Sequence, residues 1–310
     1  MGSLFDNTPH LRYESFLRRA PKYEYSITPM RTPKRIEPLI QDGFVDEVVR
    51  QLMSGKEASV YMVRCGGEIR CAKVYKEANK RSFRQSTDYT EGRKVKNSRR
   101  ARAMEKGTRY GRKAQEESWQ NAEVDALYRL AAAGVRVPKP YSFHEGVLLM
   151  ELMIDSEGNA APRLNDLALT AELSREYHRI LITQVVRMLC AGIIHGDLSE
   201  YNVLVDTTGP VIIDLPQAID AAANNQACKL LLRDVENITI YFGQFAPELL
   251  STNYGVEIWS LYQSGQLQPE SILTGHFEQI EKPVDLNSVM REISDTLKEE
   301  EARKLYRTLR

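Results

Sequence analysis

Apolar residues follow two different patterns along this chain of 310 residues. In the first half they form short runs bounded by glycine, proline and polar residues, a pattern that predicts β-strands. Five such runs are expected to be strands: residues 44–53, 58–65, 69–75, 141–144 and 147–153. The pair Gly66 and Gly67 separates the second run from the third and predicts a tight hairpin between them.

Longer segments, with apolar residues at every third or fourth position, predict helices. These segments cover residues 115–133, 172–191, 225–242 and 284–309. In the first of them Glu123 shares a helix face with Trp119, Ala126, Leu127 and Leu130. Its carboxylate is therefore expected to point inward, where a buried charge needs a partner.

The change from strands to helices predicts an α+β fold in two parts. Residues 45–153 are expected to form a strand-rich lobe and residues 154–310 a mainly helical lobe, with a hinge in the loop at 155–165. Residues 1–44 contain five prolines and are expected to be an extension that drapes over the core. Residues 76–114, between the third strand and the first helix, are expected to be a flexible basic insertion.

Charge is balanced overall but uneven along the chain. The sequence has 42 Lys or Arg and 42 Asp or Glu, yet residues 76–113 contain fourteen of the former and four of the latter. The rest of the chain therefore carries a net charge of minus ten. The basic segment is either a solvated, mobile surface or an electrostatic arm for an acidic partner such as RNA.

Composition excludes several classes of protein. No apolar run approaches the length of a membrane span, and the N-terminus lacks a secretory signal, so a cytoplasmic location is expected. The four cysteines have no CxxC spacing, which argues against a zinc site and against a disulfide framework.

The segment from His195 to Asn202, followed by Asp214, carries the strongest chemical signal. Asp197 can accept a proton from an attacking hydroxyl, while Asn202 and Asp214 offer oxygen ligands to Mg²⁺. A turn at residues 207–210 between apolar runs predicts a hairpin that brings Asn202 and Asp214 to the same end. Each of these residues alone would be an ordinary loop or turn residue, but the order and spacing of the three favour phosphoryl transfer. No proton-transfer role is assigned to His195.

A second group of residues, in the first half, fits the other end of a nucleotide. Ser54, Gly55 and Lys56 form a turn whose donors can approach phosphate, although such a turn, taken alone, is more typical of an ordinary hairpin. Lys73 lies in the middle of an apolar strand, where it either faces solvent or needs an anionic partner such as Glu123 or a phosphate. A strand lysine paired with a helix glutamate is the arrangement of protein kinases.

With these motifs together, the chain resembles RIO-type atypical serine protein kinases, most closely the type-1 subfamily. The resemblance covers about residues 45–245. It rests on four motifs, at residues 53–58, 72–76, 195–202 and 212–214. The first motif, the turn at 53–58, departs from the family's STGKEA in its first two positions. Like a RIO domain, the chain lacks a GxGxxG loop, a DFG motif, an activation segment and an APE element. The implied fold is a trimmed, bilobal protein-kinase-like fold.

The resemblance also implies cofactors and site residues. It implies ATP with Mg²⁺ or Mn²⁺, autophosphorylation on serine within the flexible insertion, and an ATPase activity that in some members passes through phosphate on the aspartate equivalent to Asp214. The backbone of residues 150–153 would bind adenine, with Val60 and Ala72 above the ring and Ile213 below it. The full set of residues expected to bind the nucleotide is Ser54, Lys56, Val60, Ala72, Lys73, Glu123, Met150, Glu151, Met153 and Ile213.

Two other functions share these motifs. Small-molecule phosphotransferases of the aminoglycoside or choline type carry a similar HGD, Asn and Asp signature, although Leu215 and Pro216 after Asp214 favour a RIO kinase. An ATP-dependent switch in ribosome assembly, which binds RNA through residues 76–113, is the third hypothesis. The expected partners are a protein substrate, which includes the chain itself, and RNA or a ribosomal particle. Because long eukaryotic tails and a winged-helix pattern are absent, a bacterial origin is expected.

Overall fold

The computed structural model describes residues 32–76 and 109–276. The chain divides into two compact units, residues 1–275 and 276–310, and every helix and strand described below belongs to the first. The first 31 residues, nearly all of the basic insertion and the helix expected at 284–309 lie outside the described residues. Among the helices in the described parts, none has both the length and the apolar character needed to cross a membrane.

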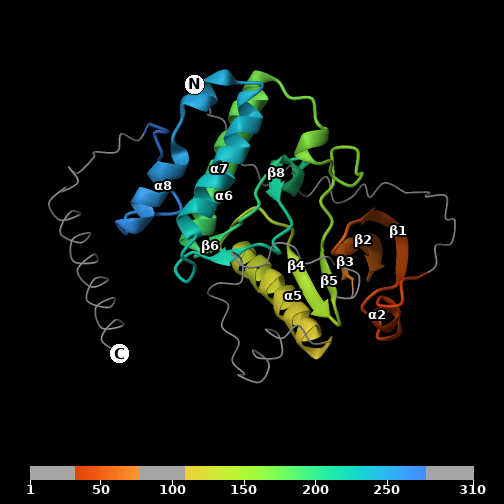
Figure 1. Ribbon diagram of the computed structural model, residues 1–310. Helices are drawn as coiled ribbons and strands as arrows, with labels where there is room; N and C mark the ends of the chain where they lie inside the picture. The colour runs from red at the N-terminus through yellow and green to blue at the C-terminus, as the bar shows by residue number, and fades with distance from the viewer. Residues whose placement is uncertain (1–31, 77–108, 277–310) are drawn as a thin grey trace, which may run out of the picture. The chain divides into compact units, whose positions relative to one another are not determined.

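The first half of the chain forms a five-stranded antiparallel sheet with strand order β1-β2-β3-β5-β4 (Figure 1). Its strands are β1 (Glu47–Ser54), β2 (Ala58–Cys65), β3 (Glu68–Tyr75), β4 (Pro140–His144) and β5 (Val147–Glu151). All five predicted strands are present, with ends that differ by a few residues. The predicted hairpin joins β2 to β3, and Gly66 and Gly67 both have the positive φ that its turn requires.

The two faces of this sheet pack against different helices. On one face Ala72, Val74 and Leu149 are buried with Ile36 and Leu39, which belong to the segment around the short helix α2 (Glu37–Gln41). The end of the predicted extension is therefore part of the core of the sheet. Apolar residues three positions apart, with a proline in the first turn, explain why this proline-containing segment still forms a helical turn.

Helix α5 (Arg109–Ala132) covers the opposite face of the sheet and carries Glu123. Ala126, Leu127 and Leu130 are buried in the same cluster as Leu148 of β5, so the predicted apolar stripe does face the core. Glu123 is only 6% exposed and lies on this stripe. The inward orientation predicted for its carboxylate is therefore present.

The second half of the chain is mainly helical. Its long helices are α6 (Ala171–Cys190), α7 (Ala227–Gly243) and α8 (Tyr254–Gln263). The sequence predicted the first two; Thr170 caps α6, with its side-chain oxygen accepting the N–H of Leu173 at 3.2 Å. The ten-residue α8 was not predicted, because it is too short to show a clear apolar period.

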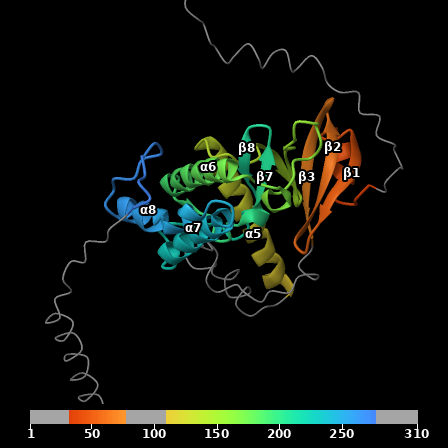
Figure 2. The same cartoon turned by 90° about the horizontal axis from the view of Figure 1, so that it is seen from above.

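Two small two-stranded sheets position the segment between α6 and α7. They pair β6 (Ile193–Ile194) with β9 (Ile219–Asp220) and β7 (Val203–Asp206) with β8 (Gly209–Ile212). The second pair is the predicted hairpin, and both views place it between the large sheet and helices α6 and α7 (Figures 1 and 2). The described structure is an α+β fold, with an antiparallel sheet in its N-terminal part and helices in its C-terminal part.

Candidate active site

Lys73 of β3 and Glu123 of α5 form a buried ion pair. Lys73 Nζ lies 2.5 Å from Glu123 Oε1, and the side chains are 13% and 7% exposed. Tyr75, two residues along the same strand, donates from its hydroxyl to the other oxygen of Glu123 at 2.8 Å. Both oxygens of the inward carboxylate thus have partners, which offsets the cost of burying its charge. The tyrosine was not predicted from the sequence.

Lys73 also contacts Asp214, which follows β8. Its Nζ lies 2.9 Å from Asp214 Oδ1, so one ammonium group bridges two carboxylates from distant parts of the chain. Burial lowers the pKa of Lys73, but the charges of Glu123 and Asp214 outweigh it and hold that pKa well above its ordinary value. In return, the charge of Lys73 lowers the pKa of Asp214 against the effect of burial. Both groups remain ionised at neutral pH.

The backbone at Asp214 is unusual. Its φ angle is 67°, in the left-handed region that residues other than glycine rarely adopt. The preceding residue fixes this geometry, because the N–H of Ile213 donates to the carbonyl of Asn202 at 3.0 Å and the Ile213 carbonyl lies 3.0 Å from His195 Nε2. Such strain in a carboxylate-bearing loop is typical of functional sites.

Asp197 and Asn202 lie in one loop and contact each other. The Asn202 side-chain amide donates to the Asp197 carbonyl at 2.8 Å, and the same nitrogen is 3.5 Å from Asp197 Oδ2. The Asp197 N–H donates to His195 Nδ1 at 3.3 Å, which leaves Nε2 to donate to the Ile213 carbonyl. Through these two contacts His195 joins the loop to the backbone before Asp214.

Asp234 of α7 fixes the backbone of the loop that contains Asp197. Its two carboxylate oxygens accept the N–H groups of Gly196 at 2.7 Å and of Leu198 at 3.0 Å, and Asp234 is 2% exposed. Arg233 donates to the carbonyl of Gly196 and Asn237 to that of Leu198. Asp234 was not predicted from the sequence, although a carboxylate on an apolar helix stripe is the signal that identified Glu123.

The predicted phosphate-binding turn lies between β1 and β2. Lys76, at the end of β3, donates to Ser54 Oγ at 3.1 Å and to the carbonyl of Gly55 at 2.5 Å, and Ser59 Oγ lies 3.2 Å from Ser54 Oγ. Lys56 is exposed and pairs with no other residue in the described parts of the chain. Lys76 thus shapes the turn while the ammonium group of Lys56 remains available to a ligand.

The adenine-binding prediction requires one correction, at Ala72. Pairing places Val60 opposite Lys73 and Met150 opposite Cys71, so Val60, Cys71 and Met150 share the face of the sheet on which Lys73 meets Glu123. Ala72 is adjacent to Lys73 and therefore points to the other face, where it packs beside α2. The residue on the cleft face two positions before Lys73 is Cys71, a buried thiol whose pKa burial raises to about 12.

The remaining predicted adenine contacts lie after β5 and β8. Glu151 makes two hydrogen bonds with Lys139: its N–H donates to the Lys139 carbonyl at 2.8 Å, and its side-chain carboxylate accepts the Lys139 N–H at 3.2 Å. The Met153 carbonyl accepts the Ala161 N–H at 2.9 Å. Within the described residues the N–H of Met153 has no acceptor, which leaves it available to a base edge. Ile213 is partly exposed beside Asp214.

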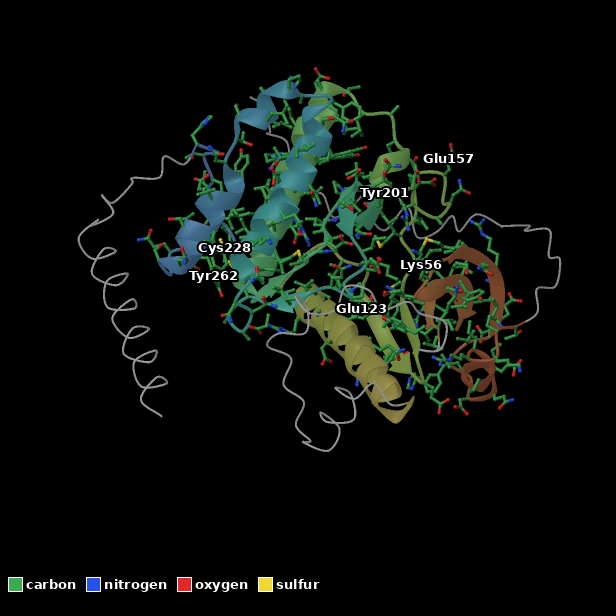
Figure 3. The ribbon with its side chains drawn as sticks, viewed as in Figure 1. Lys56, Glu123, Glu157, Tyr201, Cys228 and Tyr262 are labelled. Carbon is green, nitrogen blue, oxygen red and sulfur yellow. The ribbon has the colours of Figure 1, made fainter. Side chains whose placement is uncertain are left out.

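The side chains of the site come from all parts of the fold. Figure 3 shows Glu123 on α5, Lys56 at the sheet and Tyr201 beside the β7–β8 hairpin. In the described parts, no group of three or more His, Cys, Asp or Glu residues is arranged to hold a metal ion. A metal at Asn202 and Asp214 would therefore depend on ligand oxygens from a bound nucleotide, as Mg²⁺ commonly does.

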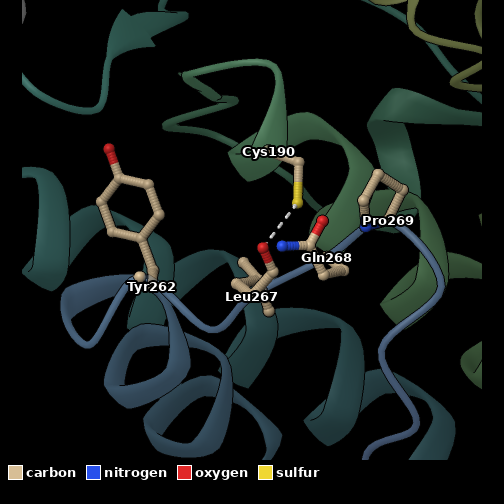
Figure 4. A pocket seen from close by; sticks show the side chains of 6 residues that line it. Cys190, Tyr262, Leu267, Gln268 and Pro269 are labelled. Atoms are coloured by element: carbon tan, nitrogen blue, oxygen red, sulfur yellow. Dashed lines mark hydrogen bonds between the residues drawn. The ribbon is translucent and has the colours of Figure 1, made fainter.

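One pocket lies elsewhere. Its volume is about 340 Å³, and it is lined by Cys190, Tyr262, Gly265, Leu267, Gln268 and Pro269 (Figure 4). The Cys190 thiol lies 3.9 Å from the Leu267 carbonyl there. None of the predicted site residues lines this pocket. The candidate site is therefore identified by the charged and hydrogen-bonding groups gathered around Lys73 and Asp214, and not by this pocket.

Comparison with known proteins agrees with this geometry. A family model described as the RIO domain matches residues 59–254, which include Lys73, Glu123, Asp197 and Asp214. The chain belongs to the RIO domain family. The match contains three of the four motifs on which the resemblance rests, and it ends within α8.

Relatives of this RIO protein are named as kinases. The Haloferax volcanii protein named RIO-type serine/threonine-protein kinase Rio1 is 35% identical over 227 residues, which cover 71% of this chain and 72% of that protein. The Methanocaldococcus jannaschii protein of the same name is 31% identical, with 68% of each chain covered. The Schizosaccharomyces pombe serine/threonine-protein kinase rio1 is 29% identical, and the chain spans only 43% of its length.

These names confirm the resemblance to type-1 RIO kinases and do not favour a small-molecule phosphotransferase. A crystal structure described as a kinase domain aligns with a TM-score of 0.44 and 13% identity over 71% of this chain and 67% of that chain, a likeness too weak to support an argument. The bacterial origin stays a prediction, since the relatives cited above are archaeal and fungal.

Proposed function

We propose that this RIO protein is an ATP-dependent serine/threonine protein kinase. One observation carries the proposal: Lys73 bridges Glu123 and Asp214, and the segment that leads to Asp214 is hydrogen-bonded to the loop that contains Asp197. These contacts support one site that contains the proposed nucleotide-binding lysine, the proposed metal-binding carboxylate and the candidate base. The names of the relatives support the same activity.

Lys73 is proposed to hold the α- and β-phosphates of ATP. Its ammonium group is kept charged and in place by Glu123, whose second oxygen is held by Tyr75. The turn with Ser54 and Lys56 would supply further donors to the phosphates. Val60, Cys71 and Met150 form the apolar face for adenine, and the backbone of Glu151 and Met153 would meet its edge, with Ile213 on the opposite side.

Asn202 and Asp214 have the donor atoms that Mg²⁺ or Mn²⁺ prefers. The Asn202 side-chain amide donates to the Asp197 carbonyl, so the amide oxygen of Asn202 points away from that contact. Asp214 has a second carboxylate oxygen in addition to the one bound to Lys73. When bound, the metal would neutralise charge on the phosphate oxygens. Two protein ligands are sufficient for Mg²⁺ if the nucleotide and water supply the others.

Asp197 is proposed to deprotonate the acceptor hydroxyl. The hydroxyl oxygen then attacks the γ-phosphorus, the bond to the bridging oxygen breaks, and ADP leaves. Burial raises the pKa of Asp197 above its ordinary value, and the positive charge of Arg233 opposes this rise in part. A carboxylate that is more basic than usual is suited to this role.

The substrate and the cellular setting are also proposals. The acceptor is expected to be a serine of a protein, including the chain itself. RNA or a ribosomal particle is expected to bind through residues 76–113, nearly all of which lie outside the described residues. A cytoplasmic location and the domain limits at residues 44, 153 and 310 likewise stay predictions.

The test measures transfer of label from γ-labelled ATP, with Mg²⁺, to protein and to free phosphate in the wild type and in Asp197→Ala. Glu236→Ala is the control for loss of an exposed carboxylate. Label on serine of the wild type and the control, but not on Asp197→Ala, is the expected result. Free phosphate without labelled serine would support an ATPase switch. Equal labelling by Asp197→Ala would refute the assignment of the base.

A further inference from the structure

Arg136 lies in the connection between α5 and β4, and its backbone is bonded to two other elements. Its N–H donates to the side-chain oxygen of Gln184 at 2.9 Å, and its carbonyl accepts the N–H of Ile212 at 2.9 Å. Gln184 is a buried residue of α6, and Ile212 is the last residue of β8. The connection is thus fixed both to the helical half of the fold and to the strand that leads to Asp214.

The side chain of Arg136 forms an ion pair with the other strand of the same hairpin. Its Nη2 lies 2.8 Å and 2.7 Å from the two carboxylate oxygens of Asp206, the last residue of β7. The side chains are 27% and 10% exposed, so the pair is partly buried. Asp206 also accepts the N–H and the hydroxyl of Thr208 in the turn of the hairpin. Arg136 therefore contacts β8 through its carbonyl and β7 through its guanidinium group.

The open end of this hairpin carries the two proposed metal ligands. Asn202 directly precedes β7, and Asp214 lies two residues beyond the end of β8. Asp214 has a φ of 67°, and a strained conformation of this kind persists only where the surrounding contacts determine it. The hydrogen bond from Ile212 to the Arg136 carbonyl is one of these contacts. A displacement of Arg136 would therefore be transmitted to Asp214.

The same connection continues from α5, which carries Glu123, the other carboxylate that Lys73 contacts. Lys73 comes from the sheet, and it can bridge the two carboxylates only while they keep a matching separation. Arg136 links the segment that carries Glu123 to the strand that leads to Asp214 without the participation of Lys73. It is thus suited to set that separation.

Two other arginines join the end of α5 to α6. Arg129 donates to the carbonyl of Ala191 at 2.7 Å, and Arg187 donates to the carbonyl of Gly134 at 3.2 Å. Both acceptors follow the ends of helices, where carbonyl groups lack intrahelical partners. These two contacts do not involve β7 or β8. Arg129, with a side chain that is 51% exposed, therefore offers a comparison for Arg136.

We propose that Arg136 is a positioning residue for Asp214. Its ion pair with Asp206 holds the connection after α5 against the hairpin, and its carbonyl keeps β8 and the proposed metal ligand that follows it in place. The proposal rests on the proposed function, because it takes Asn202 and Asp214 as ligands of Mg²⁺ or Mn²⁺. Mg²⁺ requires a near-ideal arrangement of its ligands, and residues that orient the ligands contribute to its affinity. Arg136 should therefore affect metal binding more than nucleotide binding.

The test measures how much a metal ion adds to nucleotide affinity. Binding of ADP to the full chain is measured by titration calorimetry with Mn²⁺ and again with EDTA, and the ratio of the two affinities reports the metal held by the protein. In Arg136→Met this ratio is expected to fall on the order of tenfold, as for loss of a contact that orients a metal ligand, while the metal-free affinity changes by less than about twofold. An unchanged ratio, or an equal loss with and without Mn²⁺, would overturn the proposal.

Arg129→Met is the matched control. It removes an arginine that also joins α5 to the helical half, through a contact that lies outside the hairpin. The ratio is expected to be that of the wild type. A fall equal to that of Arg136→Met would show that any loosening of α5 is sufficient, and would contradict a specific role of Arg136.

Asp206→Ala tests the route through the ion pair. Since removal of either partner breaks the same contact, Asp206→Ala should lower the ratio to a similar extent as Arg136→Met. The double variant Arg136→Met with Asp206→Ala should lower it no further, because the two residues act through one interaction. Additive losses would refute the role given to the ion pair.

A thermal transition is measured for each variant. If Arg136→Met has no cooperative transition, Arg136→Gln replaces it, because glutamine keeps one donor group for Asp206 without the charge. A lowered ratio in that variant supports the proposal, and an unchanged ratio refutes it.

Asp214→Asn separates failure of the metal site from failure of the role of Arg136. If this variant has the ratio of the wild type, the proposed metal site fails. The exchange rate of the Ile212 amide hydrogen in the nucleotide-free protein then decides the role of Arg136. Faster exchange in Arg136→Met but not in Arg129→Met supports the positioning role, and an exchange rate equal to that of the wild type refutes it.

Discussion

The hydroxyl of Tyr75 donates a 2.8 Å hydrogen bond to Glu123 Oε2, on the carboxylate oxygen that Lys73 does not contact. The two donors lie two residues apart on β3 and therefore on the same face of the sheet. One strand thus satisfies both oxygens of a carboxylate contributed by a helix. This arrangement fixes α5 to the sheet at the point where the nucleotide phosphates are proposed to bind.

Replacement of Tyr75 by phenylalanine should therefore weaken both stability and nucleotide binding. It leaves one oxygen of a buried carboxylate without a donor, which costs about 1–3 kcal/mol of unfolding free energy. The KM for ATP should rise a few-fold as Glu123 and Lys73 lose their fixed orientation. Denaturant unfolding and initial rates measure the two effects. Tyr61→Phe on β2, whose side chain points to the other face, is the control, and equal effects of the two variants would contradict the prediction.

Removal of the lysine should cost more stability than removal of the tyrosine. In Lys73→Met, the buried Glu123 loses its positive partner, and loss of one member of a buried ion pair typically costs about 3–5 kcal/mol. Binding of both ATP and ADP should weaken. Chemical denaturation and nucleotide titration test this. The double variant Lys73→Met with Glu123→Leu should recover part of the stability but none of the nucleotide affinity.

The sequence predicted features that depend on local periodicity. The five strands of the sheet, the hairpin before Asp214 and the inward face of Glu123 all follow from the spacing of apolar residues within one helix or two neighbouring strands. The error at Ala72 came from motif matching, because the alternation of side chains across a strand assigns the cleft face to Cys71 once Lys73 faces the cleft.

Features that depend on distant contacts were not predicted. Asp234 and Tyr75 acquire their roles through partners that are 36 and 48 residues away along the chain, in contacts with Leu198 and Glu123. However, Asp234 and Glu123 are both carboxylates on apolar helix stripes, so the same rule applied to α7 would have identified Asp234.

Asp234→Asn should slow catalysis with little effect on ATP binding. The carboxylate accepts two loop N–H groups, and an amide can accept only one and turns an N–H toward the other. The loop with Asp197 should lose its fixed position, which lowers kcat on the order of tenfold, and stability should fall by about 1–3 kcal/mol. Steady-state kinetics and unfolding test this, with Glu236→Gln on the exposed side of α7 as control. A change in KM for ATP alone would contradict the proposed positioning role.

The final prediction concerns the pH dependence of phosphoryl transfer. Asp197 must be ionised to accept a proton, and burial raises its pKa above the ordinary value of 3.8, so activity should fall on acidification at a higher pH than for an exposed aspartate. The positive charge of Arg233 favours the ionised form and lowers that pKa. Arg233→Met should therefore raise the pKa further and move the acid limb of the kcat profile to higher pH.

This shift can be measured from kcat between pH 4 and 8 at saturating ATP and Mg²⁺, with ~0.3–1 unit expected for loss of one partly solvated neighbouring charge. Lys229→Met on the same helix is the control, because it removes an equal charge from an exposed position and should leave the limb in place. Since Arg233 also donates to the Gly196 carbonyl, a fall in kcat at all pH values is expected in addition. An acid limb that stays in place or moves to lower pH in Arg233→Met would show that the ionisation limiting the rate is not that of Asp197.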